Sequence, residues 1–239
     1  MVKTMIAPAR MRLVERPTLE GFEAPGLKPA SQARSRDLLL RLFNEGLALL
    51  QEVDFDGLSV ETLCARSEAT VGAFYSRFEN KEAFINALQR IVVARTRREV
   101  LADYDGGAAP DDNIPHLIGW IAKSALVWYR RYEGLVRASL RRANGEREMW
   151  TPMRELGELQ ISCALPRIMR FLPPDAREGA EERARFAFQM LFGTVNNMVL
   201  INPGPYSIHH PATARMLAVA MSQFILSSPA ALPDMRPEN

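Results

Sequence analysis

The sequence predicts an all-α fold of about nine helices, in which an N-terminal helix-turn-helix module precedes a larger helical domain. Two observations support this fold class. Apolar residues recur at three- and four-residue steps in one segment after another, and no segment shows the sustained alternation of a strand. The apolar content of 47% over 239 residues can also fill a sizeable core, which excludes a chain that is disordered throughout.

The net positive charge of the chain comes from its N-terminal residues. The whole chain has a formal net charge of +2, but residues 1–36 hold seven basic and three acidic side chains. Residues 1–32 are also rich in proline and glycine and have no apolar period. We therefore predict a flexible basic arm over residues 1–32, which together with Arg34 and Arg36 would strengthen the binding of DNA.

Residues 33–82 are predicted to form the helix-turn-helix. In the first helix, the residues Leu39, Leu42, Phe43, Gly46, Leu47 and Leu50 share one face. Ser59 is placed to cap a short second helix, and Thr70 to cap a third one after the turn at residues 67–69. Asn80 is placed to cap a longer helix, whose part over residues 83–105 would connect this module to the next domain.

The third helix has the composition of a DNA-reading helix. Small residues at its start allow the backbone to approach base edges, and Phe74 and Phe78 would hold it from behind. Tyr75 and Lys81 are placed to contact phosphates. Together with Ser76, the small residues of this helix, Tyr75 and Lys81 form the predicted contact surface for double-stranded DNA.

The stretch over residues 71–84, VGAFYSRFENKEAF, resembles the tetracycline-repressor (TetR) family of regulators, as do Phe43, Gly46 and the pair Ser59–Val60. The resemblance covers about 50 residues. It implies phosphate contacts from Ser59, Thr70, Tyr75 and Lys81, and base contacts from Val71, Gly72, Ala73 and Arg77. One position departs from the family pattern, because Glu68 stands in the turn where the family usually has glycine, which takes positive φ without steric cost.

Residues 111–228 are predicted to form a helical effector-binding and dimerisation domain, and residues 229–239 a flexible tail. The helices of this domain are predicted to start near Asp111, Leu135, Thr151, Pro174 and Pro211. Aromatic and basic side chains in this domain suggest a pocket for a small apolar or amphipathic effector. The candidate lining residues are Trp120, Trp128, Arg137, Trp150, Phe171, Phe188 and Phe192. The alternative interpretation is that the aromatic residues are ordinary core and the arginines a solvated surface.

The last two helices are apolar over more than one stripe, which suits burial against both their own domain and a second copy. The resemblance likewise implies a homodimer that uses these helices. The predicted interface residues are Phe186, Met190, Gly193, Asn197, Leu217, Met221 and Phe224. The alternative is that both helices are core elements of a single chain.

Other function classes lack support in the sequence. No segment is long and apolar enough to span a membrane, and we expect a cytoplasmic protein. No residue pattern predicts a metal site, a cofactor or catalysis, so we do not expect an enzyme. The sequence thus favours a ligand-responsive repressor that binds a palindromic operator. One alternative is a regulator whose signal is a protein partner or that has no ligand; another is an all-α enzyme or lipid carrier.

Overall fold

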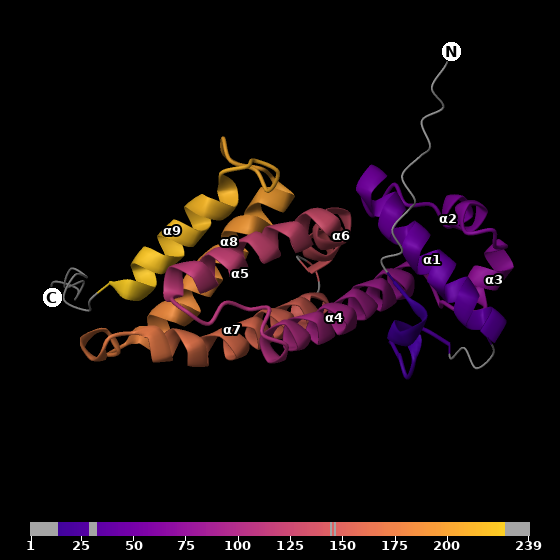
Figure 1. Cartoon of the computed structure of the whole chain (residues 1–239). Coiled ribbons are helices and arrows are strands. Elements are labelled where there is room, and N and C mark those ends of the chain that lie inside the picture. The colour runs from indigo at the N-terminus through magenta and orange to yellow at the C-terminus, as the bar shows by residue number, and fades with distance from the viewer. Residues whose placement is uncertain (1–13, 29–32, 144, 146, 228–239) are drawn as a thin grey trace, which may run out of the picture. The chain divides into compact units, whose positions relative to one another are not determined.

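The computed structural model describes residues 14–28, 33–143, 145 and 147–227 (Figure 1). These residues form nine α-helices and three short 3-10 helices with no strand, which confirms the predicted all-α class. The chain divides into two compact units at Val92 and Val93, inside a helix. Within the described ranges, no helix combines the length and apolarity needed to cross a bilayer. The predicted tail over residues 229–239 lies outside them.

The N-terminal unit contains α1 (Ala33–Glu52), α2 (Val60–Arg66), α3 (Val71–Tyr75) and the first part of α4 (Lys81–Asp105). The predicted apolar stripe of α1 is buried. At Gly46, a Cβ atom would lie 2.5 Å from Cζ of Phe84, so glycine allows α1 and α4 to approach closely.

The predicted helix caps are confirmed. Oγ of Ser59 accepts a hydrogen bond from the backbone N–H of Thr62 at 3.1 Å. Oγ1 of Thr70 accepts one from Ala73 at 3.1 Å, and Oδ1 of Asn80 accepts one from Ala83 at 2.7 Å. Since each cap satisfies an otherwise unpaired N–H, these polar residues fix where α2, α3 and α4 begin.

Residues 14–28, called here the N-terminal segment, correct the prediction of a flexible arm over residues 1–32. Val14 is buried, and its backbone N–H and C=O pair with the side-chain amide of Asn44 at 3.0 and 2.9 Å. A 3-10 helix (Arg16–Leu19) follows and lies on α1. The segment lacks an apolar period because it is held by backbone hydrogen bonds and single apolar contacts. The remainder of the predicted arm, residues 1–13 and 29–32, lies outside the described residues.

The C-terminal unit begins with the second part of α4, so the predicted connecting helix over residues 83–105 is shared between the two units. Five further α-helices and two 3-10 helices complete the unit (Figure 1). They are α5 (Ile114–Arg131), α6 (Glu133–Ala143), a 3-10 helix (Arg147–Trp150), α7 (Thr151–Phe171), a 3-10 helix (Pro174–Ala176), α8 (Ala180–Leu200) and α9 (Thr213–Leu226). Helix α9 packs against both α5 and α8, and α8 also contacts α6 and α7.

A buried arginine connects the ends of two helices in this unit. Arg183 on α8 is only 5% exposed, and its guanidinium donates hydrogen bonds to the carbonyl oxygens of Ala176, Glu178 and Ile225. These carbonyls lie before α8 and near the C-terminal end of α9. Because buried carbonyl groups need a donor, Arg183 fixes the end of α9 against the start of α8.

Candidate nucleic-acid interface and effector cavity

Helix α3 presents one exposed face and one buried face. Val71 and Tyr75 are 37% and 48% exposed, and Gly72 and Ser76 are exposed beside them. Phe74 lies on the opposite side and is fully buried. The solvent-facing side of α3 therefore consists of Val71, Gly72 and Tyr75, followed by the capping Ser76.

Gly72 leaves open space on this face. A Cβ atom at Gly72 would have only Oγ1 of Thr70 within 4 Å, at 3.9 Å. Neither packing nor backbone conformation in the free protein requires glycine here. The absence of a side chain instead leaves the backbone of α3 accessible to a close external partner.

A cluster of aromatic rings supports α3 from behind. Phe74 lies 5.1 Å from Phe78 and 5.6 Å from Phe84, measured between ring centroids. Phe43 on α1 stacks on Phe84 at 6.0 Å. Tyr75 meets the edge of Phe74 at 5.2 Å, so the exposed phenol is oriented by the buried cluster.

Arg77 is held by a contact within the domain. Its Nη2 donates a hydrogen bond to Oγ of Ser35 on α1 at 2.5 Å, and the residue is half-buried. The resemblance implied base contact for Arg77, but the third helix ends at Tyr75 and Arg77 lies in the turn after it. In this arrangement, Arg77 joins α3 to the start of α1.

Lys81 is also held by the domain. Its Nζ donates to the carbonyl oxygens of Phe55 and Leu58 at 3.1 and 3.3 Å, and lies 4.4 Å from the centroid of the Phe55 ring. The ammonium group thus fixes the loop between α1 and α2 while adding positive charge there. An ammonium has three donors, so a phosphate contact is compatible with both carbonyl bonds.

The remaining predicted DNA contacts occupy exposed or half-exposed positions. Arg34 and Arg36 are exposed on the first turns of α1, and Thr70 is exposed at the start of α3. Ala73 is half-buried. The hydroxyl of Ser59 donates to Glu61 at 2.8 Å, and this hydrogen bond lowers the pKa of that carboxyl.

The turn between α2 and α3 contains a strained residue. Glu68 has a φ of +51°, in the left-handed region that side chains other than glycine adopt at a cost. The backbone N–H of Ala69 donates to the carbonyl of Cys64 at 2.9 Å, which closes the turn around it. The position therefore favours glycine, the residue that the family pattern usually places there.

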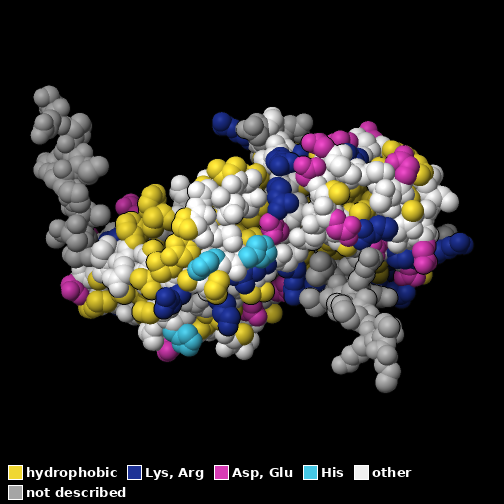
Figure 2. Space-filling view, turned by 90° about the horizontal axis from the view of Figure 1, so that it is seen from above, with side chains coloured by type: hydrophobic (Ala, Val, Ile, Leu, Met, Phe, Trp, Pro, Cys, Tyr) yellow, Lys and Arg dark blue, Asp and Glu magenta, His cyan; other side chains and the backbone are white. Residues whose placement is uncertain are grey.

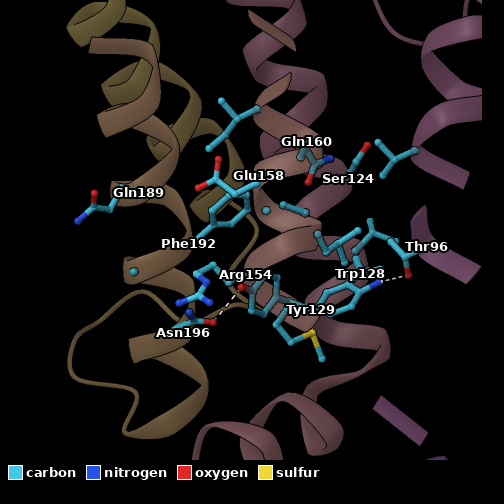
Figure 3. A pocket seen from close by; sticks show the side chains of 18 of the residues that line it. Thr96, Ser124, Trp128, Tyr129, Arg154, Glu158, Gln160, Gln189, Phe192 and Asn196 are labelled. Atoms are coloured by element: carbon cyan, nitrogen blue, oxygen red, sulfur yellow. Dashed lines mark hydrogen bonds between the residues drawn. The ribbon is translucent and has the colours of Figure 1, made fainter. Parts of the chain in front are cut away.

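The C-terminal unit contains a partly open cavity of about 1030 Å³ between α4, α5, α7 and α8 (Figure 3). Four of the predicted effector residues line it, namely Trp120, Trp128, Trp150 and Phe192. Its other apolar walls come from Val100, Met153, Leu156 and Ile161. An apolar cavity with a few placed polar groups is the usual form of a small-molecule site.

Three predicted effector residues do not line this cavity. Phe188 is fully buried and packs its ring 6.1 Å from Phe192. Arg137 donates to Glu133 at 2.6 Å and to the carbonyl of Val199 at 3.4 Å. Phe171 instead lies under the guanidinium of Arg170. Helical spacing alone could not separate the cavity side of these helices from their other sides.

Two hydrogen-bonded pairs in the cavity wall were not predicted. The hydroxyl of Tyr129 donates to Oδ1 of Asn196 at 2.8 Å, which joins α5 to α8 (Figure 3). Nε1 of Trp128 donates to Oγ1 of Thr96 at 2.8 Å, which joins α5 to α4. Both pairs connect residues more than thirty positions apart in the chain, so no local pattern indicates them.

Helices α8 and α9 carry an exposed apolar surface. Phe186 on α8 is 49% exposed, and Met216 and Val219 on α9 are 50% and 55% exposed. Figure 2 looks onto the side where α9 lies and shows hydrophobic side chains gathered there. Among the predicted interface residues, Gly193 and Asn197 are also exposed, whereas Met190, Leu217 and Phe224 are half-buried.

Met221 does not lie on this surface, contrary to the sequence-based expectation. It is 1% exposed, on the side of α9 that also buries Ser222 and Ile225. Since α9 packs on α5 and α8 together, its buried stripe is centred on Met221. The outward stripe instead contains Met216, Val219 and Leu226.

Within the part of the chain that the structure describes, no group of three metal-ligating side chains is brought together. His209 lies 2.8 Å from the carboxylate of Glu133, and His116 lies beside Asp112. These are pairs of residues, whereas a structural zinc site needs about four ligands.

Comparison with known proteins identifies the N-terminal unit. Residues 42–88 match the model of the bacterial regulatory proteins of the tetR family. The match runs from the middle of α1, through α2 and α3, into α4. No curated protein matches the chain.

Proposed function

Because this chain belongs to the tetR family of bacterial regulatory proteins and is a DNA-binding transcriptional regulator, we propose that it is a homodimeric, ligand-responsive repressor. In this proposal, two copies of α3 bind the half-sites of a palindromic operator. A small apolar or amphipathic effector enters the cavity of the C-terminal unit and releases the DNA. The family comprises regulators, and the proposal assigns no enzymatic activity or cofactor to the chain, which would act in the cytoplasm.

The observation that carries the DNA-binding role is the exposed face of α3. Val71, Gly72 and Tyr75 face solvent, while the buried Phe74 orients them from behind. A surface with open space at Gly72 and a hydroxyl at Tyr75 suits base edges and a phosphate respectively. We assign base contacts to Val71, Gly72 and Ala73.

The phosphate contacts are assigned to the residues that surround this face. They are Arg34, Arg36, Ser59, Thr70, Tyr75, Ser76 and Lys81. Residues 34–100 carry equal numbers of basic and acidic side chains, so this part of the chain adds no net charge that would attract DNA at long range. The basic residues Lys3, Arg10 and Arg12 of the proposed arm lie outside the described residues, and we propose that they add affinity that weakens with salt.

The exposed surface of α8 and α9 supports a homodimer. A helix-turn-helix protein that reads a palindrome needs two reading heads about one helical turn apart on the DNA. Phe186, Met216 and Val219 are large apolar side chains on adjacent helices, and their exposure costs free energy unless a partner covers them. We propose that a second copy of the chain covers this surface.

The cavity supports a small-molecule signal, and its lining indicates the class of effector. Three tryptophans and Phe192 favour a flat or bulky apolar body. The formal charges of the residues that line the cavity cancel, since four are basic and four are acidic. They are Lys123, Arg131, Arg154, Arg185, Glu99, Asp103, Glu158 and Glu182. This balance favours a neutral or zwitterionic amphipathic compound over a polyanion.

In this proposal, Phe186 couples effector binding to the dimer surface and so to DNA binding. It lines the cavity, and its ring also lies 5.7 Å from that of Phe224 on α9, beside the proposed dimer surface. An effector that displaces Phe186 would change how the two copies meet, and thus the spacing of their recognition helices. Binding then favours a dimer geometry that no longer matches the operator.

The proposal is tested by selecting genomic DNA fragments with the purified full-length protein and sequencing what is retained. We expect fragments that share a palindrome, and we expect Tyr75→Ala to retain far fewer of them. Small compounds are then screened for release of the selected fragment, with Trp128→Ala as the cavity variant. Retention of no fragment at low salt would refute DNA binding. Release that occurs equally from Trp128→Ala would refute the assigned effector site.

A further inference from the structure

The N-terminal segment is hydrogen-bonded to residues 77–79, which lie two to four residues after the end of α3, the proposed recognition helix. The backbone N–H of Lys28 donates to the carbonyl of Arg77 at 2.8 Å, and the N–H of Glu79 donates to the carbonyl of Gly26 at 3.0 Å. Between them, Leu27 and Phe78 form an antiparallel bridge. Residues 26–28 are thus paired with residues 77–79 across the end of α3.

Helix α3 is too short to hold itself in place. It contains five residues, whereas isolated helices below about 12–15 residues are marginal in water. Its start is fixed by the Thr70 cap, and its end passes through Ser76 into the paired residues 77–79. The position of its C-terminal end therefore depends on what residues 77–79 are bonded to.

Gly26 is required for this pairing on two grounds. Its φ is +72°, and a Cβ atom there would lie 2.6 Å from Cβ of Ala83 on α4. A second glycine of the segment allows the effect of backbone strain to be distinguished from that of the steric clash. Gly21, in the same segment, has a φ of +66°, but a Cβ atom at this position would have no neighbouring atom within 4 Å. Substitution of Gly21 therefore meets only the backbone strain.

A series of packed aromatic rings connects the N-terminal segment to the DNA-facing surface of α3. Phe22 meets the edge of Phe43 at 6.3 Å, and Phe43 lies 5.9 Å from Phe78. Phe78 contacts Phe74 at 5.1 Å, which in turn contacts Tyr75. A displacement of the segment is therefore transmitted through packed rings to an exposed residue of α3.

We propose that the N-terminal segment is a positioning element of the DNA-reading domain, with Gly26 as its critical residue. It touches neither bases nor phosphates in this proposal. It fixes the C-terminal end of α3 so that the base-reading residues are presented at the correct angle. The inference rests on the DNA-binding role argued above, and deepens it by adding residues that lie before the matched range 42–88.

The test compares Gly26→Ala with Gly21→Ala in the full-length protein. Specific and non-specific duplexes are titrated at a temperature where circular dichroism shows both variants to be folded. We expect Gly26→Ala to raise the operator Kd by about tenfold or more, because misplaced base contacts lose their discrimination. Non-specific Kd and the salt slope should stay unchanged, since the phosphate contacts are the same in number. Gly21→Ala should bind the operator like the wild type.

A second pair of variants decides the matter if Gly26→Ala does not fold. Lys28→Pro removes the single N–H that bonds to Arg77, and Lys28→Ala removes the same charge while keeping that N–H. We expect only the proline variant to lose preference for the operator. If either pairing-deficient variant folds and binds operator as its control does, the inference is overturned. If the wild type itself retains no DNA, the proposed function has failed instead.

Discussion

The guanidinium of Arg77 donates a hydrogen bond to Oγ of Ser35, at an Nη2–Oγ distance of 2.5 Å. This bond joins Arg77, two residues after the end of α3, to the first turn of α1, more than forty residues earlier in the chain. It gives Arg77 a structural role at a position where the family pattern suggests contact with bases. The two roles make different predictions for DNA binding.

Arg77→Ala should lower the free energy of unfolding by about 1 kcal/mol, the net value of one intramolecular hydrogen bond. Because Arg77 is held inside the domain, its loss should weaken binding to all sequences alike rather than change which base is preferred. Ser35→Ala removes the same bond while leaving the arginine, and serves as the matched variant. A set of operator point mutants titrated with each protein distinguishes the roles. A change of preference at one base pair, seen for Arg77→Ala alone, would restore the base-reading role.

Glu68→Gly should stabilise the protein by about 1 kcal/mol, because glycine adopts positive φ without the steric cost that Glu68 bears. Glu68→Ala removes the same negative charge but keeps the strain. We therefore expect both variants to bind DNA somewhat more tightly at low salt, and only the glycine variant to resist denaturant better. Urea unfolding and DNA titration on the pair measure the two effects separately. Equal stability of the glycine and alanine variants would contradict the strain at this turn.

Val219→Arg should convert the proposed dimer to a monomer of 26.9 kDa, because it places a charge in the middle of the exposed α9 stripe. The control is Leu101→Arg, which changes an exposed apolar residue on α4, away from that stripe. Sedimentation equilibrium or light scattering measures the mass of each variant. If Val219→Arg keeps the mass of the wild type, or if both variants dissociate, the proposed interface is wrong.

Alkaline pH should destabilise the fold through buried tyrosines. Burial raises the pKa of Tyr104, Tyr129 and Tyr132 above the usual value of 10.0. In the unfolded chain these phenols ionise near pH 10, while in the native state they stay protonated, so the native state binds more protons. The free energy of unfolding should then be steady below about pH 9 and fall as the pH rises above 10.

Tyr129→Phe provides the control for this pH dependence. It removes one ionisable hydroxyl and the 2.8 Å bond to Asn196, so it should be less stable at pH 8 but lose less stability between pH 9 and 11. Urea denaturation at several pH values gives both quantities. A steeper loss for Tyr129→Phe than for the wild type would show that the sign assigned to this group is wrong.

Local patterns in the sequence predicted the elements whose causes are local. The caps at Ser59, Thr70 and Asn80 act within three residues of the chain, and the apolar stripe of α1 follows a simple period. The family model over residues 42–88 agrees with the resemblance drawn from residues 71–84. The helix-turn-helix over residues 33–82 was therefore predictable from the sequence.

Features that depend on distant partners were not predictable in this way. The N-terminal segment has no period because its order comes from Asn44 and from residues 77–79. Met221 was assigned to the wrong side of α9, since only the joint packing of α5 and α8 fixes which stripe is inward. Likewise, Arg137 lies outside the cavity because Glu133 and the end of α8 hold it.

The most direct test of the central claim is the operator affinity of Gly72→Leu, measured together with its stability. A Cβ atom has open space at this position in the free protein, and leucine is a better helix former than glycine, so the substitution should raise stability by about 0.5–1 kcal/mol. The same side chain would occupy the space that base edges must enter, and the operator Kd should rise by more than about tenfold. A folded, more stable variant that has lost the operator is the predicted result. Unchanged operator binding by Gly72→Leu would contradict the claim that this face of α3 reads DNA.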